Sequence, residues 1–340
     1  MVDIISFAAS LTIIFSLYLI SALSLNLEYG FTGIPNFGKV AFQAIGAFVT
    51  GAFIAYTILY ISGSSISIFS PEAIVQRNEY AILNPSIVAI LFITSIILST
   101  LISGLFGYIV SKPALRLRED YLALLLLIFG EVLRLITRNY YPLVGGTHGL
   151  AGIPNPFSWT GMSSLLPYSI IVVIIALLIF TFLEKLLNSP YGRTLKAIRE
   201  NELSAQLLGK ALIKFKGQVI MLGSAIAGLG GALYAFYTGY VVADDFIPQK
   251  TFDLWLIVIL GGAANNKGIL LGTLIVTLID RGTMYLSGVA VLPIEVNYVR
   301  YIAVGALMLL ILYYRPSGIL SEKPLKTPAV EVLKKYDRNT

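Results

Sequence analysis

Residues 4–25 read IISFAASLTIIFSLYLISALSL, a run of 22 positions without one charged side chain. A helix of about 20 apolar residues crosses the hydrocarbon core of a bilayer, which is about 30 Å thick. No Lys or Arg precedes this run, and it is longer than the apolar part of a secretory signal, which has about 7 to 15 residues. The run therefore predicts a membrane-spanning helix rather than a cleaved leader.

Further apolar runs follow along the chain. Three are as free of charge as the first, at 40–62, 85–110 and 217–242. Five are shorter or interrupted, at 121–137, 167–183, 253–264, 268–293 and 296–314. Since backbone amides in lipid must bond within their own segment, each run is expected to be helical. We predict an all-α, polytopic transmembrane helix bundle with about nine spans.

The composition agrees with this class of protein. Of the 340 residues, 57% are hydrophobic and 12% are charged, whereas a soluble domain carries about 25% charged residues. The chain has no cysteine and one histidine, which excludes thiol catalysis and argues against a zinc site. We expect no metal, no bound cofactor and no nucleic acid partner.

The basic residues predict the orientation, because Lys and Arg in short loops mark the cytoplasmic side. They cluster at 112–118, at 185–216 and after residue 314. Nine spans place these clusters on one side together with Lys39 and Lys267, and leave Arg77 and Lys250 in outside loops. We predict an outside N-terminus, a transmembrane domain over 1–315, and a basic cytoplasmic tail over 316–340.

The segment 253–264 is too short for a simple span. Its 12 residues cover only about 18 Å at 1.5 Å per residue. We expect it to be re-entrant, with compensation by a break near Asp280 and Arg281. These two residues are expected at a helix end.

Glycines and small residues punctuate the chain. The pattern GxxGIPN occurs at 30–36 and again at 149–155, and both copies are expected to be irregular backbone because Pro and Gly end helices. Small residues repeat every four positions in the run 217–242, a spacing that permits close helix packing in lipid. They are Gly223, Ala227, Gly231 and Ala235.

A long polar loop at 188–216 contains SPYGRTLKAIRENE from residue 189. Ser189 followed by Pro190 is typical of a helix start. Leu195, Ile198, Ala205 and Leu208 then fall on one side, which predicts a short amphipathic helix on the cytoplasmic face. Such a helix either lies on the membrane surface or docks into a groove of a partner.

The sequence SPYGRTLKAIRENELSAQLLGK at 189–210 resembles the coupling loop of LivM-type permeases of branched-chain amino acid ABC importers. The stretches LRLREDYLALLLLIFGEVLRLITRN at 115–139 and GGTHGLAGIP at 145–154 are similar to the same family. The chain departs from the family pattern at Leu203, where the permease signature has an acid, at Lys39, where histidine is usual, and at Ala264, where glycine is usual.

The resemblance implies a permease subunit in the plasma membrane that carries branched-chain or similar apolar amino acids. It also implies a second permease of LivH type, two ATPase subunits and an extracytoplasmic binding protein. The candidate coupling residues are Gly192, Arg193, Ala197, Ile198, Asn201, Ala205 and Gly209. The chain has no GxxxxGK[ST] phosphate loop, so ATP and magnesium are expected on the partner subunits.

Candidate residues of the path or outer gate lie in two places. Glu131 and Arg134 are three apart on one helix, and form either a structural ion pair or a contact to the charged groups of the substrate. The glycines of 145–149 either free backbone amides for a bound carboxylate or form a tight turn. The candidate residues of this loop are Gly145, Gly146, Thr147 and Gly149. His148 beside them is either a pH-sensitive group or only a polar loop residue.

Three other functions compete with this interpretation. A permease for sugars or nucleosides is of the same class, and the segments 115–139 and 145–154 argue against it. An ion-coupled secondary transporter needs membrane-embedded acids, and only Glu131 and Asp280 are apparent, each with a basic neighbour. A membrane enzyme is not favoured because the sequence shows no catalytic constellation.

Overall fold

The computed structural model describes residues 4–64, 66–289 and 296–322. Helices dominate the described residues, and the strands are two residues long each. The elements in chain order are α1 (Ile4–Thr32), α2 (Lys39–Ile61), α3 (Pro71–Leu83), α4 (Pro85–Ala114), α5 (Glu119–Asn139), α6 (Tyr141–Val144), η1 (Gly146–His148), β1 (Leu150–Ala151), η2 (Ser158–Ser164), α7 (Leu165–Asn188), α8 (Pro190–Glu200), α9 (Glu202–Leu207), α10 (Leu212–Thr238), β2 (Tyr240–Val241), η3 (Ala243–Phe246), α11 (Pro248–Gly261), α12 (Asn266–Val289) and α13 (Val296–Tyr314).

The predicted fold class is confirmed. Each of the nine apolar runs corresponds to one helix, namely α1, α2, α4, α5, α7, α10, α11, α12 and α13. In the described part of the chain, five helices are long and apolar enough to cross a membrane: α1, α2, α4, α7 and α10. The number of complete crossings among the remaining four helices stays a prediction.

The helix α10 lies at the centre of the bundle, where it packs against α4, α2 and α1. Its row of small residues faces these neighbours: Ala227 and Ala235 are fully buried, and Gly231 approaches the backbone of Gln43 on α2. In lipid, such close contact of backbones supplies the van der Waals attraction that the hydrophobic effect does not. The packing role predicted for this row is therefore confirmed.

The helix α11 spans 14 residues, or about 21 Å of rise, and begins inside the bundle after the short turn η3. This agrees with a segment too short to cross. The predicted break at Asp280 and Arg281 is wrong, because α12 runs without interruption from Asn266 to Val289. These two charges therefore lie within a helix rather than at its end, and their backbone amides stay in the helical ladder.

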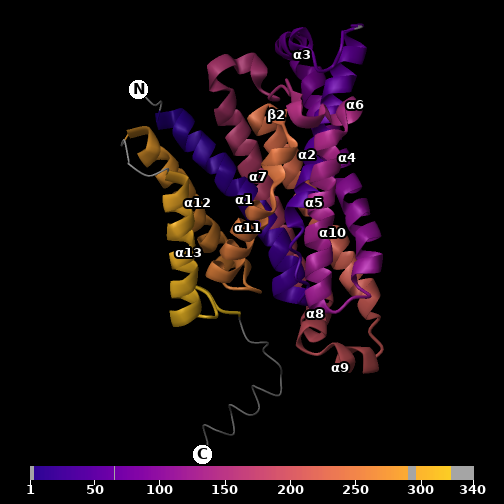
Figure 1. Cartoon of the computed structure of the whole chain (residues 1–340), viewed down its shortest axis with the longest axis vertical. Coiled ribbons are helices and arrows are strands. Elements are labelled where there is room, and N and C mark those ends of the chain that lie inside the picture. Colours follow the sequence, from indigo (N-terminus) through magenta and orange to yellow (C-terminus); the bar gives the residue numbers. More distant parts are fainter. Residues whose placement is uncertain (1–3, 65, 290–295, 323–340) are drawn as a thin grey trace, which may run out of the picture.

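The two ends of the bundle carry different elements (Figure 1). The helices α3 and α6 lie at the end where α1 begins. The helices α8 and α9 lie at the opposite end, with the last turn of α13. Basic residues gather there too, since Lys112, Arg116 and Lys210 line one cavity beside α9. The predicted grouping of these loops on one side agrees with this arrangement.

The predicted tail over 316–340 begins as part of the bundle. The amides of Ile319 and Leu320 donate to the carbonyls of Leu260 and Gly261 at the end of α11, at 2.9 and 3.1 Å. The described chain after α13 is therefore docked on the bundle up to Glu322. The remaining basic residues of the predicted tail lie outside the described residues.

Other loop predictions can be compared with the structure. Both GxxGIPN copies leave regular structure at their second glycine, and Asn36 and Asn155 each accept a hydrogen bond from the amide two residues on. Arg77, expected in an outside loop, belongs to α3, where its side chain is buried and donates to the carbonyls of Ile68 and Ala151. Burial lowers the pKa of its guanidinium to about 10.

The central packing gives a first prediction. A Cβ added to Gly231 would overlap the carbonyl oxygen of Gln43, whereas one added to Gly282 on α12 meets nothing within 4 Å. Gly231→Ala is therefore expected to destabilise the protein by about 1–3 kcal/mol through overpacking. The measurement is the midpoint of thermal unfolding in detergent, with Gly282→Ala as the matched control. Equal midpoints for the two variants would contradict the packing role.

Candidate functional site

The helix α8 has the amphipathic character that its sequence predicts. Ser189 caps it by accepting a hydrogen bond from the amide of Tyr191, and Pro190 occupies the first turn. Leu195 and Ile198 are fully buried where α8 packs against α7 and α1. The apolar face of α8 therefore covers the protein's own bundle, and the opposite face, with Arg193 and Ala197, is exposed.

The helix α9 follows at once and presents a different surface. The side chain of Asn201 caps it by accepting a hydrogen bond from the amide of Ser204 at 2.8 Å. Leu203, Leu207 and Leu208 are 68%, 82% and 79% exposed. The prediction that Leu208 shares the buried side with Leu195 is wrong, because the capped corner at Asn201 turns α9 away from the helix axis of α8.

The seven candidate coupling residues separate into two groups in the structure. The buried ones fix the loop to the bundle or within itself: Gly192, Ile198 and Ala205. The exposed ones face away from the bundle: Arg193, Ala197, Asn201 and Gly209. We call the outer surface of α8 and α9, with Arg193, Leu203, Leu207 and Leu208, the coupling surface.

Charged side chains tie the coupling surface to the rest of the protein. Arg199 donates to the carbonyl of Gly30 at the end of α1. Arg199 and Lys196 also pair with Glu322, at 2.7 and 2.8 Å. Glu202 pairs with Lys216 in the first turns of α10. These contacts connect α8 and α9 to α1, to α10 and to the segment after α13.

Just inside this end of the bundle lies an ion pair that the sequence did not indicate. The Nζ atom of Lys39 is 2.8 Å from Oε1 of Glu28, and both side chains are 0% exposed. Lys39 was expected in a cytoplasmic loop, but it opens α2 inside the protein. Gly223 of α10 makes room for the carboxylate, since a Cβ there would overlap Oε1 of Glu28. The pair thus joins three helices.

The short segment between α1 and α2 fits around this pair. Asn36 donates from Nδ2 to Oε2 of Glu28 at 2.9 Å. The carbonyl of Asn36 accepts a hydrogen bond from the indole of Trp255 on α11 at 3.3 Å, and the ring of Phe37 stacks on the same indole at 4.6 Å. The segment therefore connects the contact at Gly30 to the ion pair and to α11.

The signal for the buried pair was weak in the sequence. Glu28 follows the charge-free run 4–25 and Lys39 precedes the run 40–62, so both residues resembled ordinary boundaries of a loop. The structure extends α1 to Thr32 and begins α2 at Lys39. The two side chains are buried because α10 packs closely over them at Gly223, a tertiary contact that no local pattern indicates.

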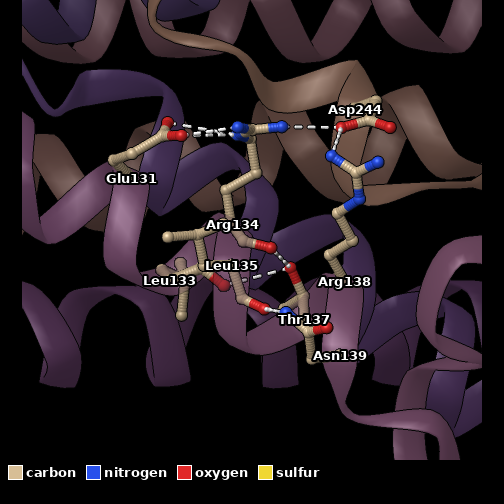
Figure 2. Close-up of polar contacts among 8 residues, drawn as sticks. All are labelled: Glu131, Leu133, Arg134, Leu135, Thr137, Arg138, Asn139 and Asp244. Atoms are coloured by element: carbon tan, nitrogen blue, oxygen red, sulfur yellow. Dashed lines mark hydrogen bonds and ion pairs between the residues drawn. The ribbon is translucent and has the colours of Figure 1, made fainter.

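Glu131 and Arg134 form the expected ion pair, and a third partner joins them (Figure 2). Nη2 of Arg134 is 2.5 Å from Oε1 of Glu131, and Nη1 is 2.6 Å from Oδ1 of Asp244. Arg138 approaches the same aspartate at 3.8 Å. Asp244 lies in η3, so these α5 cations hold the turn that leads into α11. The geometry favours the structural interpretation of this pair.

The glycine loop at 145–149 is a tight turn. The amide of His148 donates to Gly145 and that of Gly149 donates to Gly146. A Cβ on Gly145 would overlap the carbonyl oxygen of Gly149, and one on Gly149 would overlap that of Val241. Thr147 is exposed. These close contacts account for the glycines, and the turn leads into β1, which pairs with β2.

Lys250 does not lie in an outside loop, contrary to the prediction. It belongs to the first turn of α11, and its Nζ lies 5.2 Å from the ring centre of Tyr234 on α10.

Among the described residues, no group of three or more His, Cys, Asp or Glu is arranged to hold a metal ion. The absence of a bound cofactor remains a prediction.

Together, these features define a class of protein. The described bundle has five helices long and apolar enough to cross a membrane, a helix of 14 residues beside them, and at one end a surface fixed to the bundle by ion pairs. This organisation is that of a polytopic membrane protein.

The comparison with known families identifies the particular family. Residues 7–312 match the model described as branched-chain amino acid transport system / permease component. The chain belongs to this family, whose members are transport permeases rather than enzymes, and it is a multi-pass protein of the plasma membrane.

Curated relatives agree with this assignment. A protein of Methanocaldococcus jannaschii named probable branched-chain amino acid transport permease protein LivM is 36% identical over 93% of this chain and 94% of its own length. The Escherichia coli high-affinity branched-chain amino acid transport system permease protein LivM is 27% identical over 95% of this chain and 71% of its own. The M. jannaschii protein named LivH is 28% identical, over 77% and 75%. No solved structure matches the chain significantly.

The buried pair gives a second prediction. Lys39→Met leaves the carboxylate of Glu28 without its partner, which is expected to cost about 3–5 kcal/mol of stability. The double variant Glu28→Gln with Lys39→Met removes both charges and is expected to regain most of that loss. The measurement is thermal unfolding of the purified protein in detergent. A single variant as stable as the double one would contradict the pairing.

Proposed function

We propose that this chain is the membrane-spanning permease subunit of an ABC importer, and that it provides the translocation path for branched-chain or similar apolar amino acids. Separate ATPase subunits power the transport, and they dock on the coupling surface of α8 and α9. A second permease of LivH type and an extracytoplasmic binding protein complete the assembly. The cytoplasmic end is the end that carries α8, so the N-terminus is outside and the C-terminus inside.

One observation carries the proposal. The coupling surface exposes three leucines at α9, namely Leu203, Leu207 and Leu208, and the cation Arg193 on α8. The apolar residues of α8 itself, Leu195 and Ile198, are already buried. A cluster of exposed apolar side chains rimmed by polar residues marks a protein interaction site. A helix lying on lipid would instead turn the buried face of α8, with Leu195 and Ile198, towards the membrane. The structure therefore favours partner docking over a membrane-surface helix.

The attachments of the coupling surface suggest how nucleotide binding drives transport. When the ATPases close, α8 moves, and Arg199 carries this movement to Gly30 at the end of α1. The segment 33–38 then passes it to the pair of Glu28 and Lys39 and to Trp255 of α11. These hydrogen bonds and ion pairs form a continuous series of contacts from the coupling surface to the interior of the bundle.

The rival functions are less well supported. An ion-coupled transporter needs an acid that takes up and releases a proton or sodium ion. Glu28 is paired with Lys39, Glu131 is paired with Arg134, and Asp280 lies 3.7 Å from Arg281. The names of the curated relatives refer to branched-chain amino acids, which supports this substrate class over sugars or nucleosides.

The docking surface gives a third prediction. Leu207→Glu and Arg193→Glu are expected to reduce co-purification of the ATPase subunits at least fivefold, because each adds a negative charge to the coupling surface. Lys185→Glu is the matched control for Arg193→Glu, since it makes the same change of two charge units at an exposed position of α7 on the same end. The measurement is the ratio of ATPase to permease after purification from the native membrane, together with ATP-dependent leucine uptake.

Two results would contradict the proposal. The first is full retention of the ATPases by both coupling-surface variants. The second is a wild-type chain that purifies without any ATPase and transports leucine in an ion gradient alone.

A fourth prediction concerns transmission from the coupling surface. Arg199→Ala removes the contacts to Gly30 and Glu322 but leaves the exposed coupling surface unchanged. The ATPases are therefore expected to stay bound, while leucine import per ATP hydrolysed falls at least threefold. Thr194→Ala, on the same helix, serves as the control. An unchanged ratio of import to hydrolysis would show that this path does not transmit the movement.

A further inference from the structure

A cavity of about 350 Å³ lies inside the bundle, between α1, α2, α10, α11 and α12. It is lined by Leu17 and Ser21 of α1, Gln43 of α2 and Gly230 of α10, and by residues of α11 and α12. Its volume is in the range of small-molecule sites, which have about 300–1,000 Å³. The cavity is large enough for one amino acid of the size of leucine.

Charges of both signs line this cavity. Lys250 and Asp253 come from α11, and Asp280 and Arg281 come from the uninterrupted middle of α12. Oδ2 of Asp280 lies 3.7 Å from Nε of Arg281. A charge within a membrane segment costs about 2.5–3.5 kcal/mol on insertion scales, so such residues usually serve a function. A wall with both signs matches a ligand that itself carries both signs.

The remaining wall is apolar. Ile14 and Leu17 of α1, Leu254 of α11 and Phe246 of η3 line the cavity, and all four side chains are largely buried. The first turn of α11 also faces the cavity, through Gln249 and Lys250, and no side chain caps this helix start. Its positive end favours an anionic group on the same side as Lys250.

The cavity lies directly above the buried ion pair, on the same helix faces. Ser21 and Glu28 are seven residues apart on α1, Gln43 and Lys39 are four apart on α2, and Gly230 and Gly223 are seven apart on α10. Residues at these spacings share one face of a helix. The pair of Glu28 and Lys39 therefore lies between the cavity and the end of the bundle that carries α8.

From this arrangement we infer that the cavity is the substrate site of the permease, and that it takes a zwitterionic α-amino acid with an aliphatic side chain. The carboxylate lies towards Lys250 and the start of α11, the ammonium group lies towards Asp253 and Asp280, and the side chain contacts Ile14, Leu17 and Leu254. This inference rests on the proposed function, because it names the place in the path where that substrate binds.

The first test uses the complete transporter, reconstituted with its partners in liposomes, and measures leucine import and ATP hydrolysis together. Lys250→Gln and Asp253→Asn are expected to lower import at least tenfold while hydrolysis stays within twofold. Lys250→Arg keeps the charge and is expected to restore import to within threefold of the wild type. Glu79→Gln, an exposed acid on α3, is the control.

The second test measures selectivity, which a general loss of stability does not change. Leu17→Trp narrows the apolar wall, so the ratio of leucine import to valine import is expected to fall at least threefold. The binding protein and the ATPases are the same in both assays, and a changed ratio therefore reports the cavity itself.

The outcomes separate the inference from the proposed function. If the wild-type complex imports leucine, and both charge variants import it at the wild-type rate or Leu17→Trp leaves the ratio unchanged, the substrate site lies elsewhere and only the inference fails. If the charge variants fail to assemble, the ratio measured for Leu17→Trp decides. If the wild-type complex imports no amino acid, the proposed function fails and the inference fails with it.

Discussion

The ion pair between Glu28 and Lys39 is the interaction around which the bundle is organised. Both charges are wholly buried, and a buried charge persists only when a partner and hydrogen bonds replace water. The pair, with Asn36 as a further donor, holds the end of α1 against the start of α2. Gly223 lets α10 approach the carboxylate. This position of the small-residue row therefore serves both the packing of α10 and the ion pair. A larger residue at that position would force the helices apart and expose the charges.

The location of this pair connects the packing with the proposed transport. Arg199 and the segment 33–38 link it to the coupling surface, while Ser21 and Gln43 link it to the cavity through the same helix faces. Because both charges are 0% exposed, separating them would leave each without a partner, which is energetically expensive.

The half-length α11 has a second organising role. Its short rise leaves its first turn inside the bundle, where a helix end and Lys250 face the cavity, and its last turn receives the chain after α13 through two backbone hydrogen bonds. On its other side, the trio of Glu131, Arg134 and Asp244 fixes η3, which leads into α11. Glu131 and Arg134 thus hold in place the element whose first turn lines the cavity.

The fold class, the nine helical runs, the packing row on α10, the amphipathic α8 and the proximity of Glu131 to Arg134 were predictable from the residues. These features follow from local physics, because hydrophobic run length, period and three-residue spacing act within one segment. Four other features required the folded chain: Glu28 meets Lys39, Lys250 faces a cavity, Leu208 is exposed, and Asp280 and Arg281 lie within a continuous helix. Each of these depends on which face a helix turns towards distant parts of the chain, and no local pattern carries that information.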